Sequence, residues 1–386
     1  MRWLLFLASA MIFFDVAFFA AIAPLLPDYV DELGLTKAEA GILSAAYAAG
    51  TLLAALPGGY LASRIGPRRT AVYGLLALGV SSFVFGFAEQ IILLDAARFV
   101  QGVAGALIWS GALTWLMTTA PEGRRGSVMG TALGTAVAGA LLGPMLGAAA
   151  GELGTELVFS SVFVIAFALA LGAWRLPETK VPQGQPLREA LRTLVSRPVL
   201  ESAAFVAVPS VMFGAIEVLV PLRIDDLGGG HMVIAGGFLL GAGVEATLAP
   251  ISGRISDRTG RRLPYTIGLS VCAVAMVVIG LVPHLEEVLV GLVLTSFGAG
   301  LCFAPALTLM SDIAEASGLH QGYAAGLANV AWALGQVIGA VGGGIVAEAT
   351  GNAEPSLAIA LLLALTVVYA LRAMQPKAEP QAPALL

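Results

Sequence analysis

The stretch "GGYLASRIGPRR", Gly58–Arg69, returns in the second part of the chain as "SGRISDRTGRR", Ser252–Arg262. The same offset superposes further residues: Pro27 on Pro221, Asp31–Gly34 on Asp225–Gly228, Gly59 on Gly253, Arg64 on Arg258, Gly66 on Gly260 and Arg68 on Arg262. A common offset over about 40 residues indicates an internal duplication in which each copy is one structural unit. The chain is therefore expected to contain two halves of the same topology.

Around this repeat the composition is that of a membrane protein. Of the 386 residues, 58% are hydrophobic and 12% are charged, whereas soluble domains contain about 25% charged residues. Apolar segments of about 20 residues, the length at which a helix crosses the hydrocarbon core, recur along the whole chain. They cover residues 3–26, 38–62, 70–88, 91–116, 127–150, 155–174, 199–222, 232–253, 264–283, 287–311, 322–347 and 354–371. The sequence thus predicts an all-α membrane protein with about twelve transmembrane helices in two pseudo-symmetric six-helix bundles.

Enzymatic and metal chemistry find no support in the sequence. Cys272 and Cys302 lie inside apolar segments, so neither a disulfide framework nor a metal site is expected. The three histidines stand singly at segment ends, and no HExxH or GxxxxGK[ST] pattern occurs. We expect neither an enzyme nor a cofactor.

The distribution of cations predicts the orientation in the membrane. Arg98 lies inside an apolar segment; of the other cations, only Lys37 and Arg223 fall on the side opposite the termini and the central loop. Because positively charged loops stay in the cytoplasm, both termini are expected to be cytoplasmic. This topology explains the basic loops, so no nucleic acid is expected as a partner. The short loops favour the inner membrane of a prokaryote.

The longest polar interruption, Arg175 to Pro198, divides the chain almost in half. We expect an N-terminal bundle over residues 1–174, a cytoplasmic linker over 175–198, a C-terminal bundle over 199–373 and a cytoplasmic tail over 374–386. In the linker, Leu187, Leu191 and Leu194 share one helical face, which predicts a short amphipathic helix on the inner membrane surface. A linker with no fixed role is the alternative. Two bundles joined in this way are typical of a transporter that rocks about a site between them.

The repeated loop resembles the motif GxLaDrxGrk of the major facilitator superfamily, with one copy in each half. "RFVQGVAG", Arg98–Gly105, is similar to the fourth-helix motif RxxqGxgaa of that family. The fifth segment matches Gx8Gx3GPx2G in full, at Gly130, Gly139, Gly143, Pro144 and Gly147. In this superfamily that pattern is associated with drug:proton antiporters. The resemblance covers essentially the whole chain and implies a twelve-helix transporter that works by alternating access.

The fifth-segment residues also have a direct physical meaning. Glycines let two helix backbones approach closely, and Pro144 leaves a carbonyl unpaired so that the helix can bend. We expect a closely packed, kinked helix at the interface of the halves. The alternative is general packing by small residues in a chain with 47 glycines. The eleventh segment repeats Gly335, Gly339 and Gly343 but has Ala340 at the place of the proline, which predicts a kink in one half only.

The two loop copies differ at their acidic position. In the family this acid latches the cytoplasmic gate by docking on the start of a helix in the other half. The first copy has Ser63 there and the second keeps Asp257; a carboxylate at a helix N-terminus gains up to about 2 kcal/mol, whereas a serine supplies only a hydroxyl. We expect the stronger latch at Asp257, against the start of the fifth helix near Ser127, unless the arginines only set the topology. The predicted gating residues are Gly59, Ser63, Arg64, Gly66, Arg68, Gly253, Asp257, Arg258, Gly260 and Arg262.

Three carboxylic acids lie within the apolar segments. An ionised acid at the membrane centre costs about 3 kcal/mol, so such residues line a cavity or pair with another group. Asp15 stands in "FFDVAFF" near mid-membrane, and Glu217 lies near Pro221, about 12 Å closer to the outside. Because the first and seventh helices are symmetry mates, both acids are expected to border the central cavity. Glu245 is either a second proton site or a fixed partner of a backbone or hydroxyl group.

Three further polar residues are expected near the acids. Arg98 is the embedded cation, and Gln101, one turn along, is placed to hold it or a substrate. The surroundings of Asp15 and Glu217, with "YAAGLANVAW", resemble the vesicular amine transporter branch, which exchanges protons for organic cations. That branch has an acid where this chain has Asn329, which forms hydrogen bonds but carries no proton. We expect the two acids to bind proton and substrate, Arg98 and Gln101 to tune them, and Asn329 to form a hydrogen bond with the substrate.

The predicted cavity is also aromatic, since aromatic rings stack on lipophilic cations. Its expected lining is Phe14, Phe18, Tyr47, Trp109, Phe213 and Trp332. Loss of water disfavours an ionised carboxyl and a bound cation favours it, so that proton and cation displace each other. The sequence thus predicts proton-coupled export of a small lipophilic, cationic compound by a functional monomer.

Three alternatives stay open at this point. A facilitator or importer of a neutral metabolite such as a sugar fits the fold equally, but leaves the glycine pattern and the paired acids unexplained. A transport-dead receptor or scaffold is the alternative from another class, because Ser63 replaces one gating acid. For the acids themselves, the simplest alternative is that Asp15 stays protonated and bonds to a neighbouring backbone or serine.

Overall fold

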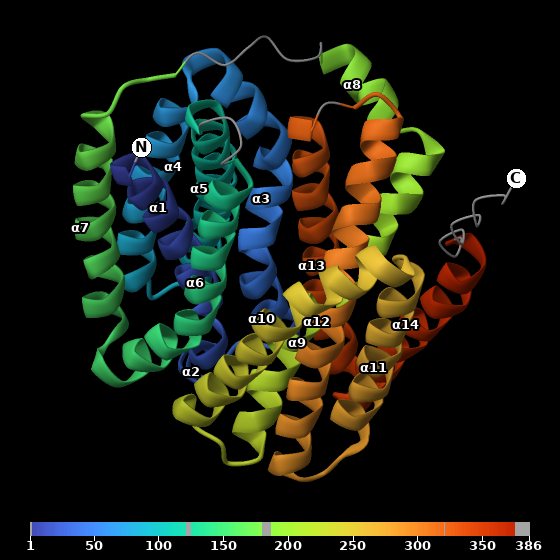
Figure 1. Cartoon of the computed structure of the whole chain (residues 1–386). Coiled ribbons are helices and arrows are strands. Elements are labelled where there is room, and N and C mark those ends of the chain that lie inside the picture. Colours follow the sequence, from blue (N-terminus) through green and yellow to red (C-terminus); the bar gives the residue numbers. More distant parts are fainter. Residues whose placement is uncertain (1, 121–124, 180–186, 320, 375–386) are drawn as a thin grey trace, which may run out of the picture.

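The computed structural model of the chain describes residues 2–120, 125–179, 187–319 and 321–374. Within these ranges the protein is built from helices and contains no strand (Figure 1). Twelve of the helical segments are long and apolar enough to cross a membrane. The expected fold class is thereby confirmed.

The helices follow the chain in two successive sets. The N-terminal half contains α1 (Arg2–Ala20), the short 3-10 helix η1 (Ala23–Leu25), α2 (Leu26–Leu33), α3 (Lys37–Ile65), α4 (Pro67–Gly86), α5 (Ile91–Thr119), α6 (Arg125–Leu153) and α7 (Thr155–Trp174). The linker contains α8 (Leu187–Leu194). The C-terminal half contains α9 (Arg197–Asp226), α10 (His231–Thr259), α11 (Arg262–Leu281), α12 (Leu285–Ala316), α13 (Gln321–Thr350) and α14 (Ala353–Ala373). Each predicted segment overlaps one of the membrane helices.

The duplication is visible in the helix bounds, with one clear difference. Helices α3 and α10 are both 29 residues long and are displaced by the offset of the repeated loop. The first membrane crossing, however, is broken: α1 ends at Ala20, and Pro24 and Pro27 stand at the starts of η1 and α2. Two prolines three residues apart remove two helical hydrogen bonds in succession. Its counterpart α9 runs without interruption through Pro209 and Pro221.

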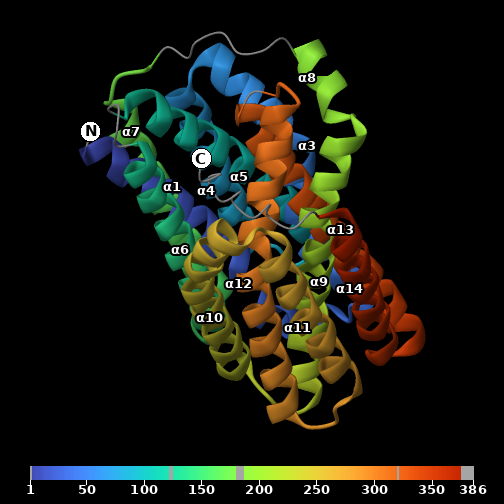
Figure 2. The same ribbon diagram turned by 45° about the vertical axis from the view of Figure 1, so that its right-hand side comes forward.

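Helix α8 lies beyond the ends of the membrane helices, on the face of the molecule where α1 begins and α14 ends (Figures 1 and 2). We call this the linker face and the other the opposite face. The helix forms where the linker sequence predicts one. Ala190 and Leu194 are buried and pack toward α9, whereas Leu191 is 44% exposed, so only part of the predicted apolar face is covered. The side chain of Leu187 lies outside the described residues.

The glycines of α6 pack this helix on α1 within the N-terminal half. A methyl group on Gly139 would lie 2.5 Å from the carbonyl oxygen of Phe13, and one on Gly143 would lie 2.6 Å from that of Ala17. In the C-terminal half Gly339 of α13 meets α9 in the same way. The stripe thus joins the first and fifth crossings of one half, rather than one half to the other. Gly130 belongs to α6, but its surroundings lie outside the described residues.

The two halves meet along two seams that the duplication relates to each other. In the first seam α3 packs on α13, where Gly41 faces Ala340 near the opposite face and Leu56 faces Gly326 toward the linker face. In the second seam α6 packs on α10, where Leu141 faces Gly243. The expected interface between two like bundles is therefore formed by their second and fifth crossings.

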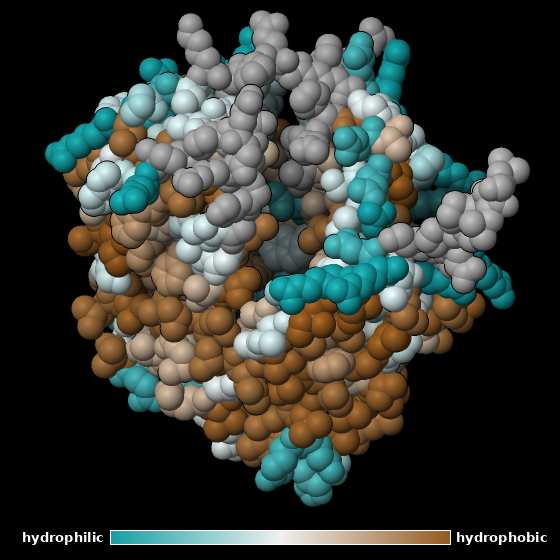
Figure 3. Space-filling view, viewed as in Figure 1, coloured by the Kyte–Doolittle hydropathy of each residue, from teal (hydrophilic) through white to brown (hydrophobic). Residues whose placement is uncertain are grey.

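Polar contacts tie the halves together at the opposite face. His231 Nε2 lies 2.7 Å from Asp28 Oδ1, and His231 Nδ1 lies 3.7 Å from Glu152 Oε1. The amide of Lys37 donates to Glu348 Oε2 at 2.8 Å, at the end of the other seam. Toward the linker face the surface is hollowed between the halves (Figure 3). The structure is thus closed at the opposite face and open at the linker face.

The packing of α6 on α1 gives a prediction about stability. Gly139→Ala places a methyl group against the α1 backbone and is expected to cost about 1–3 kcal/mol, because close-packed helices cannot move apart freely. Gly134→Ala is the matched control, since a methyl group there meets no atom within 4 Å. Thermal unfolding in detergent should show a lower midpoint for Gly139→Ala alone. Equal midpoints for the two variants would contradict the packing described.

Candidate functional site

Asp15 is held in the middle of the N-terminal half by two neutral donors. Its side chain is 1% exposed. The Tyr47 hydroxyl, on α3, donates to Oδ1 at 2.9 Å, and the Trp109 indole, on α5, donates to Oδ2 at 3.0 Å. Three membrane helices therefore converge on one carboxyl group, and each of its oxygens has a partner.

Two glycines of the fourth-helix motif make this convergence possible. A methyl group on Gly105 would overlap the Tyr47 hydroxyl and lie 2.7 Å from Asp15 Oδ1. One on Gly102 would overlap the carbonyl oxygen of Tyr47. The glycines thus bring α3 close enough to α5 for the tyrosine to reach the acid. The motif identified in the sequence is part of the site.

Arg98 is fully buried beside this group, at 1% exposure. Its guanidinium donates to the carbonyl oxygens of Phe18 and Phe19, both at 3.3 Å, and to Gln101 Oε1 at 3.1 Å. It also stands over the Tyr47 ring, 5.3 Å from the centroid. The two carbonyls belong to the last turn of α1, where a helix carries partial negative charge. Arg98 is therefore stabilised by a helix end and a ring, and Tyr47 links it to Asp15.

The break after α1 and the buried arginine occur together. In the first half Pro24 and Pro27 interrupt the crossing and Arg98 binds the carbonyls at the break. At the places equivalent to Pro24 and Arg98 the second half has Val218 and Leu292, which is 2% exposed; Pro221, the counterpart of Pro27, is kept but lies within the continuous helix α9. A continuous helix has no free carbonyls to offer a cation. The two halves thus share the fold, whereas the broken first crossing and the buried arginine occur together in the N-terminal half.

Gln101 extends the network to a fourth helix. Its side-chain oxygen accepts from Arg98, and its Nε2 donates to Ser82 Oγ on α4 at 3.2 Å. Gln101 and Ser82 are both buried. Gln101 therefore holds the arginine, one of the two roles expected for it, and both ends of its amide are used.

Glu217 lies on α9 in the other half and faces the same region. It is half-buried, and Gln336 of α13 donates to its Oε1 at 3.5 Å. Arg98 acts electrostatically on both acids, Asp15 in its own half and Glu217 across the seam. The structure thus brings three predicted residues, the two acids and Gln101, around the cation of Arg98.

Aromatic rings cross the seam next to this cluster. The Phe19 ring of α1 lies 4.8 Å from Tyr47 in its own half and 5.5 Å from Trp332 of α13, measured between centroids. On the C-terminal side, Phe213 packs on Phe303 of α12 at 5.3 Å. Tyr47, Trp109 and Trp332, three of the expected aromatics, are therefore placed at or beside the polar cluster.

Other predicted residues lie apart from the cluster. Phe18 is 3% exposed and packs on Phe159 of α7 in the N-terminal half, so its place in the cavity lining stays a prediction. Phe14 is half-buried against Phe13. Among the described residues, no hydrogen bond or ion pair joins Glu245 or Asn329 to Asp15, Arg98 or Glu217. Glu245 lies on α10 where this helix packs on Gly300 of α12.

Two residues of the cluster were missed in the sequence, although each carries a signal. Phe19 stands four residues after Asp15 and so shares its helix face, but so does Phe18 at three residues, and periodicity alone does not separate them. Gln336 lies four residues after Trp332 and seven after Asn329, on one face of α13. The shared face with Trp332 and Asn329 therefore already points to Gln336 in the sequence.

At the linker face, Glu178 closes the N-terminal copy of the loop. Its carboxylate accepts from the backbone amides of Arg68, at 3.0 Å, and Arg69, at 3.3 Å, at the start of α4. The Arg68 side chain pairs with Glu178 at 3.4 Å, donates to the Trp174 carbonyl at 2.9 Å and stands over the indole ring at 5.4 Å. A carboxylate on a helix N-terminus is stabilised by the free amides and the helix dipole. Glu178 thus ties the end of α7 to the start of α4.

The residues expected to latch the gate have different local roles. Ser63 donates to the Tyr60 carbonyl of its own helix at 2.7 Å, so it does not cap another helix. Arg64 is exposed and stands over the Tyr60 ring. Asp257 lies exposed near the end of α10. The side chain of Ser127, its expected partner, lies outside the described residues, so this latch stays a prediction.

The remaining loop residues shape the turns between helices. Gly66 and Gly260 have φ angles of 101° and 86°, which L side chains rarely adopt, and they end α3 and α10. Methyl groups on Gly59 or Gly253 would meet no atom within 4 Å. In the C-terminal copy Arg261 pairs with Asp312 of α12, while Arg262 begins α11 and Arg258 is exposed.

Twelve membrane helices in two related halves, with a polar cluster at their seam, define a membrane transporter rather than an enzyme. The chain belongs to the Major Facilitator Superfamily, whose sequence model matches residues 5–319 and, in a second overlapping match, residues 234–385. The resemblance drawn from the loop and helix motifs is confirmed.

Relatives in this family include transporters from bacteria and fungi. Over 109 residues the chain is 28% identical to the quinolone resistance protein NorA of Staphylococcus aureus (strain MRSA252), which covers 28% of each protein. Over 125 residues it is 28% identical to the MFS-type transporter ppzB of Metarhizium rileyi (strain RCEF 4871), which covers 31% of this chain and 26% of that one. The matches thus span under a third of the length of these relatives.

Solved structures share the fold over nearly the whole chain. A bacterial homologue of the human lysosomal transporter Spinster, inward-facing and occupied, superposes with a TM-score of 0.80 at 14% identity, over 96% of both chains. The human organic anion transporter MFSD10 superposes with a TM-score of 0.70 at 17% identity, over 96% of this chain and 99% of that one. At these identities the similarity concerns the fold.

The role of Glu178 is open to a direct test. Glu178→Gln keeps the shape but removes the charge, and is expected to destabilise the fold by about 0.5–2 kcal/mol through the lost cap and ion pairs. Glu189→Gln, on the exposed side of α8, is the control. Thermal unfolding in detergent measures the difference. Identical midpoints would mean that the carboxylate does not stabilise the start of α4.

Proposed function

We propose that this transporter is a proton-coupled antiporter that exports a small lipophilic, cationic compound by alternating access. The observation that carries the proposal is the pair of embedded acids, Asp15 and Glu217, one in each half and both within the field of Arg98. Neither acid has an ion-pair partner among the described residues. Asp15 is bound by Tyr47 and Trp109, and Glu217 by Gln336.

Neutral partners suit a carboxyl group that has to change its charge. An ionised acid away from water is costly unless a positive charge is near, so a proton or a cationic substrate can each satisfy it, but only one at a time. Arriving substrate therefore favours release of the proton, and an arriving proton favours release of the substrate. Because Arg98 acts on both acids, a change of charge at one is felt at the other.

The aromatic residues at the seam favour a lipophilic cation as substrate. Tyr47, Phe19 and Trp332 form a continuous set of rings from one half to the other. The electron-rich faces of such rings attract organic cations, and their area binds apolar groups. The partial match to a quinolone resistance protein supports a drug-like compound as the cargo.

The direction of transport follows from the proposed orientation. Basic residues accumulate on the linker face, which we assign to the cytoplasm, and we place the protein as a monomer in the plasma membrane of a prokaryote. The hollow at the linker face then opens to the cytoplasm (Figure 3). A cytoplasmic compound can enter there while the contacts of His231 and Lys37 keep the outer side closed. Rocking of the halves about the two seams exposes the acids to the outside.

The proposal predicts that a proton gradient drives uptake of a lipophilic cation into proteoliposomes. With an acidic interior, vesicles should accumulate ethidium against its own gradient. Asp15→Asn and Glu217→Gln should each lower the rate at least about tenfold, because a residue that cannot ionise cannot exchange proton for cation. Glu286→Gln, an exposed acid of α12, should transport as the parent does.

Proton release in unbuffered detergent gives a second readout of the same coupling. Addition of ethidium should acidify the solution of the parent protein and not that of Asp15→Asn. Ethidium equilibration that ignores the gradient would point to a facilitator. Parent rates in both acid variants would contradict the proposal.

The unequal loop copies predict unequal effects on the gate. Asp257→Asn should change the accessibility of the linker face to a cysteine reagent and slow transport about fivefold, the effect of losing about 1 kcal/mol at a helix N-terminus. Ser63→Ala should leave both unchanged, because this hydroxyl bonds within its own helix. The opposite ranking of the two variants would assign the latch to the first copy.

A further inference from the structure

The contacts that close the opposite face are related by the internal duplication. Lys37 is the first residue of α3 and His231 is the first residue of α10, and the offset of the repeated loop superposes one on the other. Each lies against an acid in the last turn of the fifth crossing of the other half. The Lys37 amide donates to Glu348 Oε2 at 2.8 Å, on α13. His231 Nδ1 lies 3.7 Å from Glu152 Oε1, on α6, so the two seams end in corresponding contacts.

Each of the two residues also has a second partner in the other half. Lys37 Nζ donates to Asn352 Oδ1 at 2.9 Å, and His231 Nε2 lies 2.7 Å from Asp28 Oδ1 on α2. The imidazole lies against the backbone of α6, because a methyl group on Gly151 would be 2.9 Å from ring atoms Cε1 and Nδ1. The ring therefore lies between α2 and α6, with one nitrogen beside an acid of each helix. It is 22% exposed, which leaves it open to protons from the solvent.

The two related contacts differ in the chemistry of their cation. A lysine stays charged over the physiological range, whereas a histidine changes its charge between about pH 5 and 8. A neutral imidazole has one N–H and can donate to one acid, whereas an imidazolium has two and can donate to both. Hydrogen bonds from a charged donor to a carboxylate are also stronger than neutral ones. The seam of α6 and α10 is therefore held by both acids only when His231 carries a proton.

Most of the other charged groups around His231 are acids. At the end of α9, Asp225 interacts electrostatically with His231 and with Asp28. Arg223, the cation of the same helix end, donates to a backbone carbonyl of the turn after α11 at 3.4 Å. Residues Ala23–Leu25 of η1 and the last turn of α11, which also pack on α10, are uncharged. The further acids at this end of the neighbouring helices are Asp31, Asp226, Glu286 and Glu287. A positive ring is therefore attracted to its surroundings while the face is closed.

We infer that His231 is a pH-dependent latch of the opposite face. When protonated, it ties the start of α10 to both α2 and α6 of the other half and keeps the face closed. When it loses the proton, one of the two ties is lost and the face opens more readily. Lys37, at the equivalent place of the other seam, is a latch that does not respond to pH in this range.

The sign of the effect follows from linkage. When the face opens, the ring leaves both acids, so the closed state binds the proton more tightly and the proton in turn favours closure. Closure is therefore strongest at acidic pH and weakens as the pH rises through the range in which a histidine loses its proton. The inference rests on the proposed function only through alternating access. In the proposed cycle, protons that arrive from outside also favour closure of the face through which they entered.

Double electron–electron resonance across the opposite face tests the latch. Spin labels are placed at Glu89→Cys, between α4 and α5, and at Glu287→Cys, in the first turn of α12; both positions are exposed. Cys272 and Cys302 are fully buried and do not compete for the label. In the labelled parent, the fraction of long distances should rise at least about threefold between about pH 5.5 and about pH 8.

Two substitutions of the histidine should act in opposite directions. His231→Gln keeps a neutral donor and should give a high open fraction with little response to pH. His231→Lys reproduces the residue of the other seam and should keep the face closed at both pH values. Lys37→Gln should raise the open fraction at both values and retain the response, and His284→Gln, an exposed histidine of the same face, should behave as the parent does. Thermal unfolding in detergent confirms that each variant is folded.

The latch and the proton exchange at the membrane acids fail separately. A pH response of parent size in His231→Gln would overturn the latch, and its loss in Asp15→Asn would then assign the response to that acid. An open face in His231→Lys at both pH values would show that the charge of the ring does not close it, which also overturns the inference. A response that depends on His231 and persists in Asp15→Asn would support the latch even if ethidium exchange were absent.

Discussion

A guanidinium buried among membrane helices needs acceptors for its charge, and Arg98 finds them at a break in the first membrane crossing. Pro24 and Pro27 end the regular hydrogen bonding of α1, and the carbonyls of Phe18 and Phe19 turn to the arginine. In the second half neither the break nor the cation is present, and α9 is continuous. The broken helix and the buried arginine thus occur together at one place in the fold. Together they make the N-terminal half the polar one.

Close packing of α3 on α5 connects the buried arginine to Asp15 through Tyr47. Gly102 and Gly105 let α3 approach α5 until Tyr47 lies between Arg98 and Asp15, with its ring on one and its hydroxyl on the other. A side chain at either glycine would separate the helices and leave the carboxyl with a single donor. The positions of the charged residues in this site therefore depend on the small residues that let the two helices approach. The proposed exchange of proton and cation depends on that spacing, because a loosely held acid would be open to water at all times.

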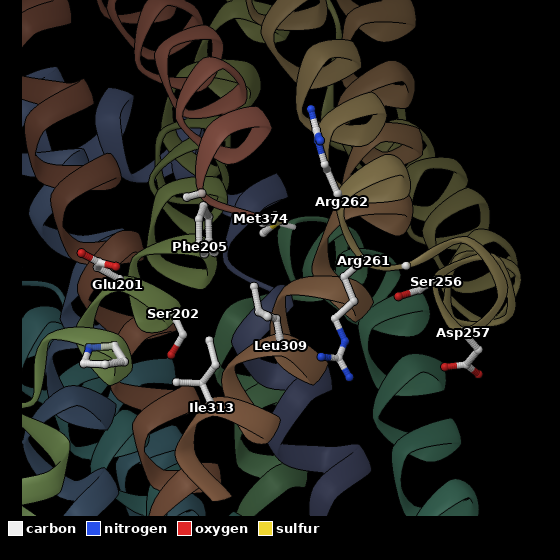
Figure 4. A pocket seen from close by; sticks show the side chains of 13 residues that line it. Glu201, Ser202, Phe205, Ser256, Asp257, Arg261, Arg262, Leu309, Ile313 and Met374 are labelled. Carbon is white, nitrogen blue, oxygen red and sulfur yellow. The ribbon is translucent and has the colours of Figure 1, made fainter. Parts of the chain in front are cut away.

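At the linker face, the two copies of the repeated turn have different surroundings. In the N-terminal half an acid of the linker caps the helix after the repeated turn, whereas the C-terminal half presents a cavity (Figure 4). The same backbone turn is thus compatible with a capping acid in one half and with an open cavity in the other.

The sequence alone determined the fold class, the duplication and the family, because hydrophobic length and a repeated motif are local properties of the chain. It also pointed to Asp15, Glu217, Arg98 and Gln101, since a charged or strongly polar side chain in an apolar segment is conspicuous wherever the helix packs. Tertiary structure alone decided which neighbours these residues have. Phe18 and Phe19, three and four residues after Asp15, lie on either side of its direction on a helical wheel, and only the positions of α7 and α13 make the first pack within its own half and the second across the seam. Likewise Glu178 stands in a polar linker like any other acid, and it becomes a helix cap only because the end of α7 returns to the start of α4.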